Sequence, residues 1–138
     1  MTDIRTVFDV GARALSAQMQ RLNTTASNIA NSGSIAGTAD AAYRPLRPVF
    51  ATDLGAAMGE GVLAAPRVDK IVTLEREPAR IFRPDSPQAD DDGFVYMSSV
   101  NNDEEMIEMV EASRQYQDIL ESLGTLRSLM ARTLKMGQ

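Results

Sequence analysis

The acidic tract from Gln88 to Gly93 is the part of this sequence that comes nearest to a metal site. Asp90–Asp92 precede a glycine, as in the oxygen-rich loops that bind calcium. Gln88, however, stands at the first ligand position, and Ser99 falls where such a loop needs a bidentate glutamate. We therefore interpret the tract as a plain turn and expect no metal site.

The side chains that most often carry catalysis are missing from this chain. It has no histidine and no cysteine, so it lacks both an imidazole base and a thiol nucleophile. Lys70 and Lys135 are its two lysines, and neither has neighbours that suggest a reactive amine. Glu104 and Glu108 lie one turn apart, which is ordinary spacing for the first turns of a helix. We expect no enzymatic activity, no catalytic residues and no cofactor.

Charge and hydropathy narrow the class of partner. The formal net charge of −5 argues against nucleic acid or an anionic membrane surface. No run of about 18 apolar residues is present, so we expect no membrane-inserted helix. The N-terminus shows no basic region followed by an apolar block, so we expect no cleaved signal peptide.

Acidic residues gather in one part of the chain. From Asp85 to Glu121 there are eleven of them against a single base, Arg114. This stretch is either a solvated acidic face or a surface that contacts the arginines of another subunit.

Apolar residues at alternating steps of 3 and 4 mark both ends of the chain and predict helices over residues 3–31 and Asn102–Met136. The first seam consists of Phe8, Ala12, Leu15, Met19, Leu22, Ala26 and Ile29. The second seam consists of Met106, Met109, Ser113, Tyr116, Leu120, Leu123, Arg127, Met130 and Leu134. Seams of this kind need partner helices, so the two ends are expected to be interaction surfaces.

The middle of the chain has a different pattern. Six prolines separate short patches that favour strands, so we expect short edge strands and no broad sheet. The patches are Tyr43, Val49–Phe50, Val62–Leu63, Val68, Ile71–Val72, Ile81–Phe82 and Gly93–Met97. Residues 32–42 are expected to form a loop.

These patterns predict a mainly α fold in which the two terminal helices pack as a coiled-coil-like pair beside a small, irregular, β-containing middle. The expected divisions are an N-terminal helix at 1–31, a loop and strand segment at 32–100, and a C-terminal helix at 101–138.

Two local features have more than one interpretation. The polar cluster from Asn23 to Asn28 is either a fraying last turn or a set of hydrogen-bonding side chains that lock the helix to its neighbours. Gly124, inside the second helix, marks either a close helix crossing or a tolerated substitution.

The segment from Ala14 to Asn31, and above all the block Ser27-Asn28-Ile29-Ala30-Asn31, resembles the N-terminal signature of bacterial flagellar axial proteins. Further blocks with the spacing of the short proximal rod members of this family are Tyr43-Arg44, Val49-Phe50, Pro84-Asp85, Ala89-Asp90, Gly93-Phe94-Val95, Val100-Asn101, Glu105-Met106, Ala112-Ser113-Arg114, Tyr116-Gln117 and Gly137-Gln138. The likeness covers nearly the whole chain.

This resemblance implies a D0-type pair of terminal helices and a structural subunit of the proximal rod. The subunit would assemble helically and transmit torque from the motor to the hook. Its expected partners are copies of itself, other proximal and distal rod proteins, the rod–ring junction protein and the flagellar type III export apparatus. Its expected place is the rod that spans the periplasm.

The expected assembly interface consists of Phe8, Leu15, Met19, Leu22, Ser27, Asn28, Ile29, Asn31, Met106, Met109, Tyr116, Leu120, Leu123, Met130 and Leu134. Because two lone helices bury little surface, we expect the termini to be mobile in the free monomer and to become ordered on assembly. The competing hypothesis is a soluble coiled-coil adaptor or export chaperone that uses the same seams.

Overall fold

The structure is a computed structural model that describes residues 4–53 and 64–136. Helices α1 (Ile4–Ala30) and α2 (Asn102–Met136) confirm the two predicted terminal helices. Asn101 begins α2 as its cap, because its side-chain oxygen accepts hydrogen bonds from the backbone N–H groups of Asp103 and Glu104. The acidic residues of the first turn of α2 also suit the positive end of the helix dipole.

Strands β2 (Leu46–Asp53) and β3 (Ala65–Thr73) form an antiparallel hairpin. The register pairs Leu46 with Thr73, and an irregularity follows Val49. Pro48 and Pro66 fit within these strands because each strand of a two-stranded sheet keeps one free edge. The predicted patch at Val62–Leu63 lies outside the described residues.

A second small sheet has the order β1–β5–β4 and consists of β1 (Ile35–Ala36), β4 (Ala79–Phe82) and β5 (Phe94–Met97). The last two strands confirm the predicted patches at Ile81–Phe82 and Gly93–Met97. The expectation of a loop over residues 32–42 was wrong at β1, which pairs with β5. Tyr43 lies outside the strands. Val95 is fully buried at the centre of this sheet.

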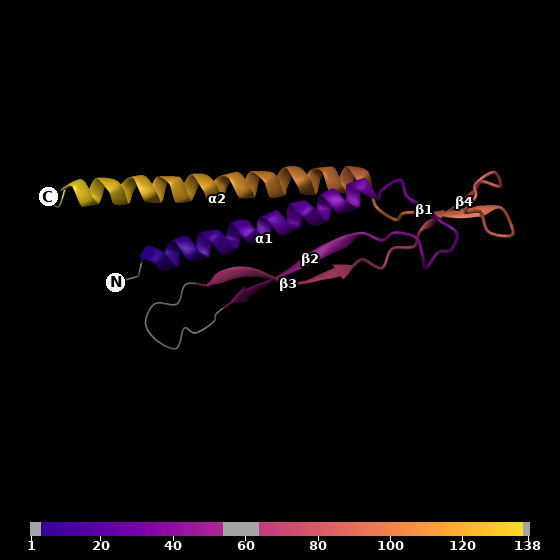
Figure 1. Ribbon diagram of the computed structural model, residues 1–138, viewed down its shortest axis with the longest axis horizontal. Helices are drawn as coiled ribbons and strands as arrows, with labels where there is room; N and C mark the ends of the chain where they lie inside the picture. Colours follow the sequence, from indigo (N-terminus) through magenta and orange to yellow (C-terminus); the bar gives the residue numbers. More distant parts are fainter. Residues whose placement is uncertain (1–3, 54–63, 137–138) are drawn as a thin grey trace.

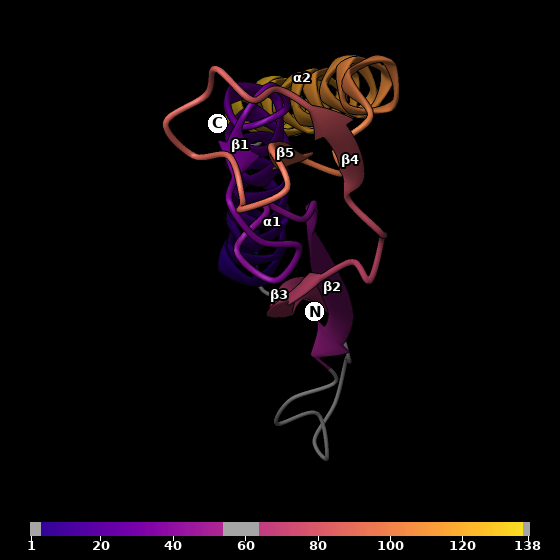
Figure 2. The same cartoon turned by 90° about the vertical axis from the view of Figure 1, so that its right-hand side faces the viewer.

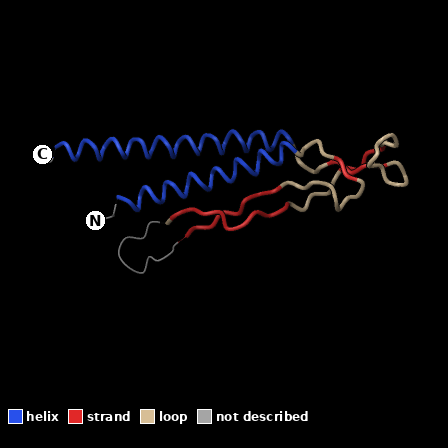
Figure 3. Tube along the Cα trace, viewed as in Figure 1, coloured by secondary structure: helices blue, strands red, loops and turns tan. Residues whose placement is uncertain are grey.

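The elements form an elongated molecule with α1 between α2 and the β2–β3 hairpin (Figure 1). The sheet of β1, β4 and β5 lies beyond the end where the helices converge, and the start of α1 and the end of α2 lie at the opposite end (Figures 1 and 3). The view along the molecule shows the hairpin on the side of α1 away from α2 (Figure 2). The pairing of the terminal helices is confirmed, while its coiled-coil geometry and the domain divisions stay predictions.

Buried apolar side chains within the described residues are mostly small. Ala17 in α1, Ala112 in α2 and Ala65 in β3 are buried, whereas Met19 of α1 and several leucines and methionines of α2 remain exposed. The contacts between layers therefore depend on close backbone approach and on polar side chains. No helix within residues 4–53 and 64–136 is long and apolar enough to cross a membrane.

The acidic tract forms a turn. The carboxylate of Asp90 accepts hydrogen bonds from the backbone N–H groups of Asp92 and Phe94, at 3.1 and 2.8 Å. Gly93 has a φ of 81°, which a glycine adopts without strain. Arg80 lies 3.7 Å from Asp90 and 3.6 Å from Asp92, so these carboxylates have a partner within the chain. Among the described residues no acidic group of three or more could hold a metal ion.

Candidate assembly interface

Asn28 joins three elements at the end of α1. Its side-chain nitrogen donates to the carbonyl of Leu46 at 2.9 Å and to Oε2 of Glu105 at 3.0 Å. Its side-chain oxygen accepts from the backbone N–H of Leu46 at 2.9 Å and from the hydroxyl of Tyr43 at 3.0 Å. Asn28 is 0% exposed, and these four hydrogen bonds use both donors and both acceptor sites of its amide. Of the two interpretations of the polar cluster, the structure supports the one in which hydrogen bonds hold the helix.

Glu105 extends this network from the first turn of α2. Its carboxylate is fully buried and meets Arg47 of β2 through two close contacts, at 2.6 Å to Oε1 and 2.8 Å to Oε2. The hydrogen bond and charge of Glu105 raise the pKa of Arg47. A buried carboxylate is stable only when it is paired and hydrogen-bonded, so Asn28, Glu105 and Arg47 depend on one another. We call these three residues the junction.

A second ion pair lies beside the junction. Arg76 meets Glu104 in a fork, with distances of 2.8 and 3.0 Å between its nitrogens and the two carboxylate oxygens. The hydrogen bonds from Arg76 lower the pKa of Glu104, and the nearby positive charge of Arg47 acts in the same direction. Half-exposed Glu104 therefore connects the segment after β3 to the start of α2.

Polar side chains continue the contact along the two helices. Arg21 donates to Glu108 at 3.1 and 2.6 Å and to Gln115 at 3.2 Å. Gln18 donates to the side-chain oxygen of Gln115 at 2.9 Å. Glu104 and Glu108 each pair with an arginine of this same chain, so part of the acidic stretch is neutralised internally. Neither interpretation of the acidic stretch, as a solvated face or as a contact with another subunit, included ion pairs within the same chain.

Gly11 lets a side chain of α2 pack directly against the backbone of α1. A Cβ atom built on Gly11 would lie 2.5 Å from a terminal carbon of Leu123, so the leucine occupies the space that a side chain would need. Gly124, in contrast, has nothing within 4 Å of a built Cβ. Within the described residues Gly124 marks no close helix crossing, and the close contact between α1 and α2 lies instead at Gly11, one residue before Ala12 of the first seam. A close crossing at Gly124 with a helix of a neighbouring subunit stays a prediction.

The residues of α1 that contact α2 stand one position before members of the first seam. Gly11, Gln18, Arg21 and Asn28 make these contacts, whereas the first seam contains their successors, among them Met19 and Leu22. One residue corresponds to a turn of about 100° around the helix. The first seam therefore faces to one side of the contact with α2. Its large side chains Phe8, Leu15, Leu22 and Ile29 are half-buried and Met19 is exposed.

The second seam shows the same offset except at one position. Glu105, Glu108 and Gln115 contact α1 and precede Met106, Met109 and Tyr116 of the seam. Leu123 is the exception, because it belongs to the seam and also packs on Gly11. The remaining exposure varies: Met109, Tyr116 and Met130 are half-buried, and Met106, Leu120 and Leu134 are exposed.

The other expected interface residues, Ser27 and Asn31, contribute to the end of α1. The side chain of Asn31 donates to the carbonyl of Ser27 at 2.8 Å, and the Ser27 hydroxyl lies 3.3 Å from that of Tyr43. Both residues are half-buried, whereas Asn28 exposes no surface. Contact of any of the expected residues with a neighbouring subunit stays a prediction.

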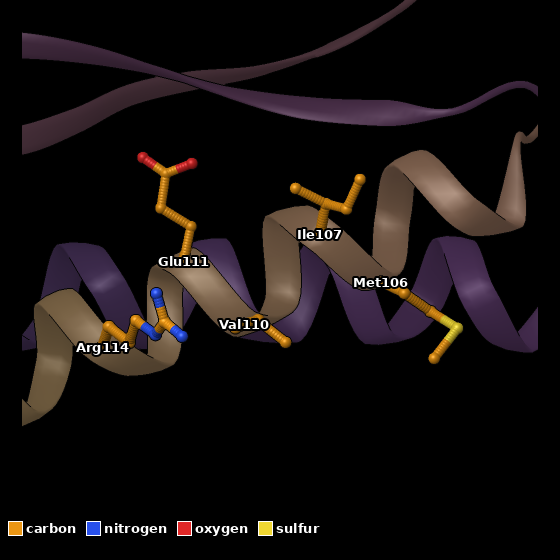
Figure 4. A pocket seen from close by; sticks show the side chains of 5 residues that line it. All are labelled: Met106, Ile107, Val110, Glu111 and Arg114. Atoms are coloured by element: carbon orange, nitrogen blue, oxygen red, sulfur yellow. The ribbon is translucent and has the colours of Figure 1, made fainter.

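An apolar surface on α2 extends beyond the predicted residues. A shallow hollow along one side of α2 is lined by Met106, Ile107, Val110, Glu111 and Arg114 (Figure 4). Glu111, at its border, also lies 3.9 Å from Arg21 of α1. Met106, Ile107 and Val110 are 55, 68 and 53% exposed. The sequence reasoning missed Ile107 and Val110 because it followed a single seam. The one-turn spacing of Met106 and Val110 was the available signal.

Two segments of the chain and the chain as a whole resemble known proteins. A family model described as "Flagella basal body rod protein" matches residues 8–32, and another described as "Flagellar basal body rod FlgEFG protein C-terminal" matches residues 91–136. These two segments include most of α1 and all of α2.

Full-length relatives share the same description, "Flagellar basal-body rod protein FlgC". The Yersinia enterocolitica protein is 40% identical over 132 residues, and the Salmonella typhimurium protein is 36% identical over 132 residues. The Escherichia coli O157:H7 protein is 39% identical over 134 residues. Each alignment covers 96% of this chain and 96% of the relative.

Proposed function

This chain belongs to the FlgC family of flagellar basal-body rod proteins, as a structural rod subunit and not an enzyme, and from this premise we propose that it builds the proximal rod through its two terminal helices. In this proposal the helices join a tube of packed helices contributed by copies of the chain and by other rod proteins. The tube transmits torque from the motor to the hook. The family assignment does not favour the alternative of a soluble adaptor or export chaperone.

The observation that carries the proposal is the offset between the polar contact and the apolar seams. Gln18, Arg21 and Asn28 form the polar contact of α1 with α2. Apolar side chains of both helices therefore lie beside this contact. Burying a large apolar side chain is favourable by roughly 1.5–3 kcal/mol relative to leaving it exposed. Exposed and half-exposed residues such as Met19 and Leu120 therefore gain stability when neighbouring subunits cover them.

The junction supports the same proposal through its position. It fixes the end of α1 to the start of α2 and to β2 within one chain, so a single subunit presents both helices and the hairpin in a defined arrangement. A subunit that carries torque needs internal contacts of this kind, because a load on one helix must reach the other elements.

The proposed location is the rod in the periplasm, reached through the flagellar type III export apparatus without a cleaved signal peptide. The proposed neighbours are the other proximal rod proteins, the distal rod protein and the rod–ring junction protein. The family assignment supports a place in the basal-body rod. The periplasmic location, the export route and the individual neighbours are part of the proposal.

A charged substitution in the first seam tests the proposal. Leu22→Asp places a carboxylate on a surface that the proposal assigns to a neighbouring subunit. Asn23→Asp adds the same charge at the next position, where the side chain is exposed. Each variant replaces the native chain in a flagellated strain. The protein content of isolated basal bodies and the swimming of the cells are then measured, and circular dichroism of the purified chains checks the helices.

We expect Leu22→Asp to remain soluble and helical but to be absent from basal bodies, and Asn23→Asp to be incorporated. Normal rods that contain Leu22→Asp would overturn the proposed use of the seam. A native chain that is found throughout the cytoplasm and not in basal bodies would overturn the proposed function itself.

A further inference from the structure

Helix α2 has one long side that no described part of the chain covers. This stripe, which we call the outer face, runs through Met106, Ile107, Val110, Asp118, Leu129 and Arg132. At 100° per residue these positions lie on the side opposite buried Glu105 and Ala112. All six are exposed in the structure. The outer face is distinct from the second seam, with which it shares Met106.

The sign of charge changes along the outer face. Its first half carries Asp103, Glu111, Asp118 and Glu121 beside Arg114, whereas its last turns carry Arg132 and Lys135. No acidic residue follows Glu121 in α2. One face of one helix thus has an acidic amino-terminal half and a basic carboxyl-terminal end.

Apolar side chains accompany both charges. Met106, Ile107 and Val110 form the hollow in the acidic half, with Glu111 and Arg114 at its border (Figure 4). Leu129 and Met136 are 54 and 81% exposed on the basic end. The two halves are therefore complementary: both offer apolar groups for burial, and their charges are of opposite sign, which favours pairing.

The basic end also projects beyond the helix pair. The contacts Asn28–Glu105 and Gly11–Leu123 set an antiparallel register in which the start of α1 lies opposite about residue 130 of α2. The six residues that follow extend roughly 9 Å farther at 1.5 Å per residue. All of residues 131–136 are exposed, and Figure 1 shows the end of α2 projecting past α1.

We propose that the acidic half of the outer face receives the basic carboxyl-terminal end of the corresponding helix from an adjacent rod subunit. The inference rests on the proposed function, because it needs subunits that stack along a rod. A contact between two different surfaces is head-to-tail, and such contacts repeat into open helical arrays when the rotation between subunits does not close a ring. The family model that matches residues 91–136 describes the carboxyl-terminal region of basal-body rod proteins. This supports the presence of a corresponding helix in related subunits.

A photo-crosslinking amino acid identifies the group that covers the outer face. It is incorporated at Ile107 in one variant and at Gln117, an exposed position on the same face, in a second variant. The control carries it at Arg83, an exposed position outside α2. Cells are irradiated, basal bodies are isolated, and mass spectrometry identifies the peptides that are linked to this chain.

We expect both outer-face variants to link to the last two to three turns of the carboxyl-terminal helix of a rod subunit, and the Arg83 variant to link elsewhere. Links from Ile107 and Gln117 to an amino-terminal helix, to a ring protein or to no protein would overturn the inference. Because these chains are recovered from basal bodies, that result would leave the proposed function intact. A bulky group at Ile107 that prevents incorporation leaves Gln117 to decide the outcome.

A charge reversal tests the electrostatic part independently. Asp118→Lys with Glu121→Lys changes the sign of the acidic half without touching the contact between α1 and α2, while Asp85→Lys with Asp91→Lys makes the same change in net charge at exposed residues outside α2. We expect the first pair to lower the amount of chain in basal bodies at least about tenfold and the second to have little effect. Equal incorporation of the two double variants would contradict the proposed charge pairing.

Discussion

The amide nitrogen of Asn28 lies 3.0 Å from the carboxylate of Glu105, and both side chains are fully buried. They come from opposite ends of the chain, 77 residues apart, and meet where α1 ends and α2 begins. Arg47 completes this junction from the hairpin. The polar groups that hold the chain together internally are thus separate from most of the apolar groups that we assign to assembly.

The junction predicts a large effect of a small substitution. Asn28→Ala removes four hydrogen bonds. The backbone N–H of Leu46 loses its side-chain partner, and the carbonyl of Leu46 and Oε2 of buried Glu105 keep only Arg47. Each buried polar group that loses its partner costs about 1–3 kcal/mol, so we expect a loss of at least about 3 kcal/mol in the free energy of unfolding. Urea denaturation of the purified chain measures it. Exposed Asn23→Ala is the control, and equal stability of the two variants would contradict the account.

Two glycines predict opposite results for the same substitution. Gly124→Ala adds a methyl group in open space inside a helix, so we expect a gain of about 1 kcal/mol in the free energy of unfolding. Gly11→Ala places a carbon 2.5 Å from Leu123, which must move, so the same gain is lost or reversed. Thermal unfolding of both variants decides this. If they were stabilised equally, the close approach at Gly11 would be refuted.

The sequence was sufficient to predict the two helices and most of the strands. Steps of 3 and 4 located α1 and α2, and patches of β-branched and aromatic residues located β2, β3, β4 and β5. It did not reveal which side of each helix faces the other. An apolar seam shows where burial is favourable but not whether the partner belongs to the same chain. The contact actually used depends on Gly11 and on polar residues such as Arg21 and Glu108, which local periodicity does not distinguish from surface residues.

The junction could be predicted from the sequence only in part, for the same reason. The polar cluster near the end of the first helix was visible, and a holding role was one of its two interpretations. The partners of this cluster could not be predicted, because Glu105 and Arg47 are distant from Asn28 in the sequence. Glu105 has the pattern of an ordinary acidic residue in a first helical turn, and Arg47 that of an ordinary charged residue in a strand.

The ion pair between Glu104 and Arg76 predicts a dependence of stability on pH. Hydrogen bonds from Arg76 hold the pKa of Glu104 below its value in the unfolded chain. Glu104 therefore stabilises the fold above its unfolded pKa, and this contribution is lost as the pH falls through the folded pKa. We expect the native chain to lose more of its urea resistance between pH 6 and about pH 3 than Glu104→Gln does.

The control for this experiment is Asp103→Asn. Asp103 is exposed and forms no ion pair with the described residues. Its neutralisation should leave the acid-induced loss nearly unchanged. A Glu104→Gln variant with the same pH dependence as the native chain would show that the pair with Arg76 does not contribute.

Amide hydrogen exchange on the dilute monomer should show a gradient along both helices. We expect the slowest exchange near the junction, at residues 25–30 and 105–112, and fast exchange at 4–10 and 127–136. The junction holds one end of the helix pair, while residues 131–136 lie exposed at the other. This gradient localises the expected mobility of the termini. Uniformly strong protection from residue 4 to residue 136 would rule out ordering on assembly.

Oxidation of Met19 and Met106 gives the most direct measure of whether neighbours cover the apolar seams. The two methionines are 42 and 55% exposed in the single chain, and each belongs to one seam. Peptide mass spectrometry compares their oxidation rates in the free chain and in isolated basal bodies under the same oxidant. We predict that both rates fall at least about tenfold in the basal body. Unchanged rates at both methionines in chains recovered from the rod would contradict the account.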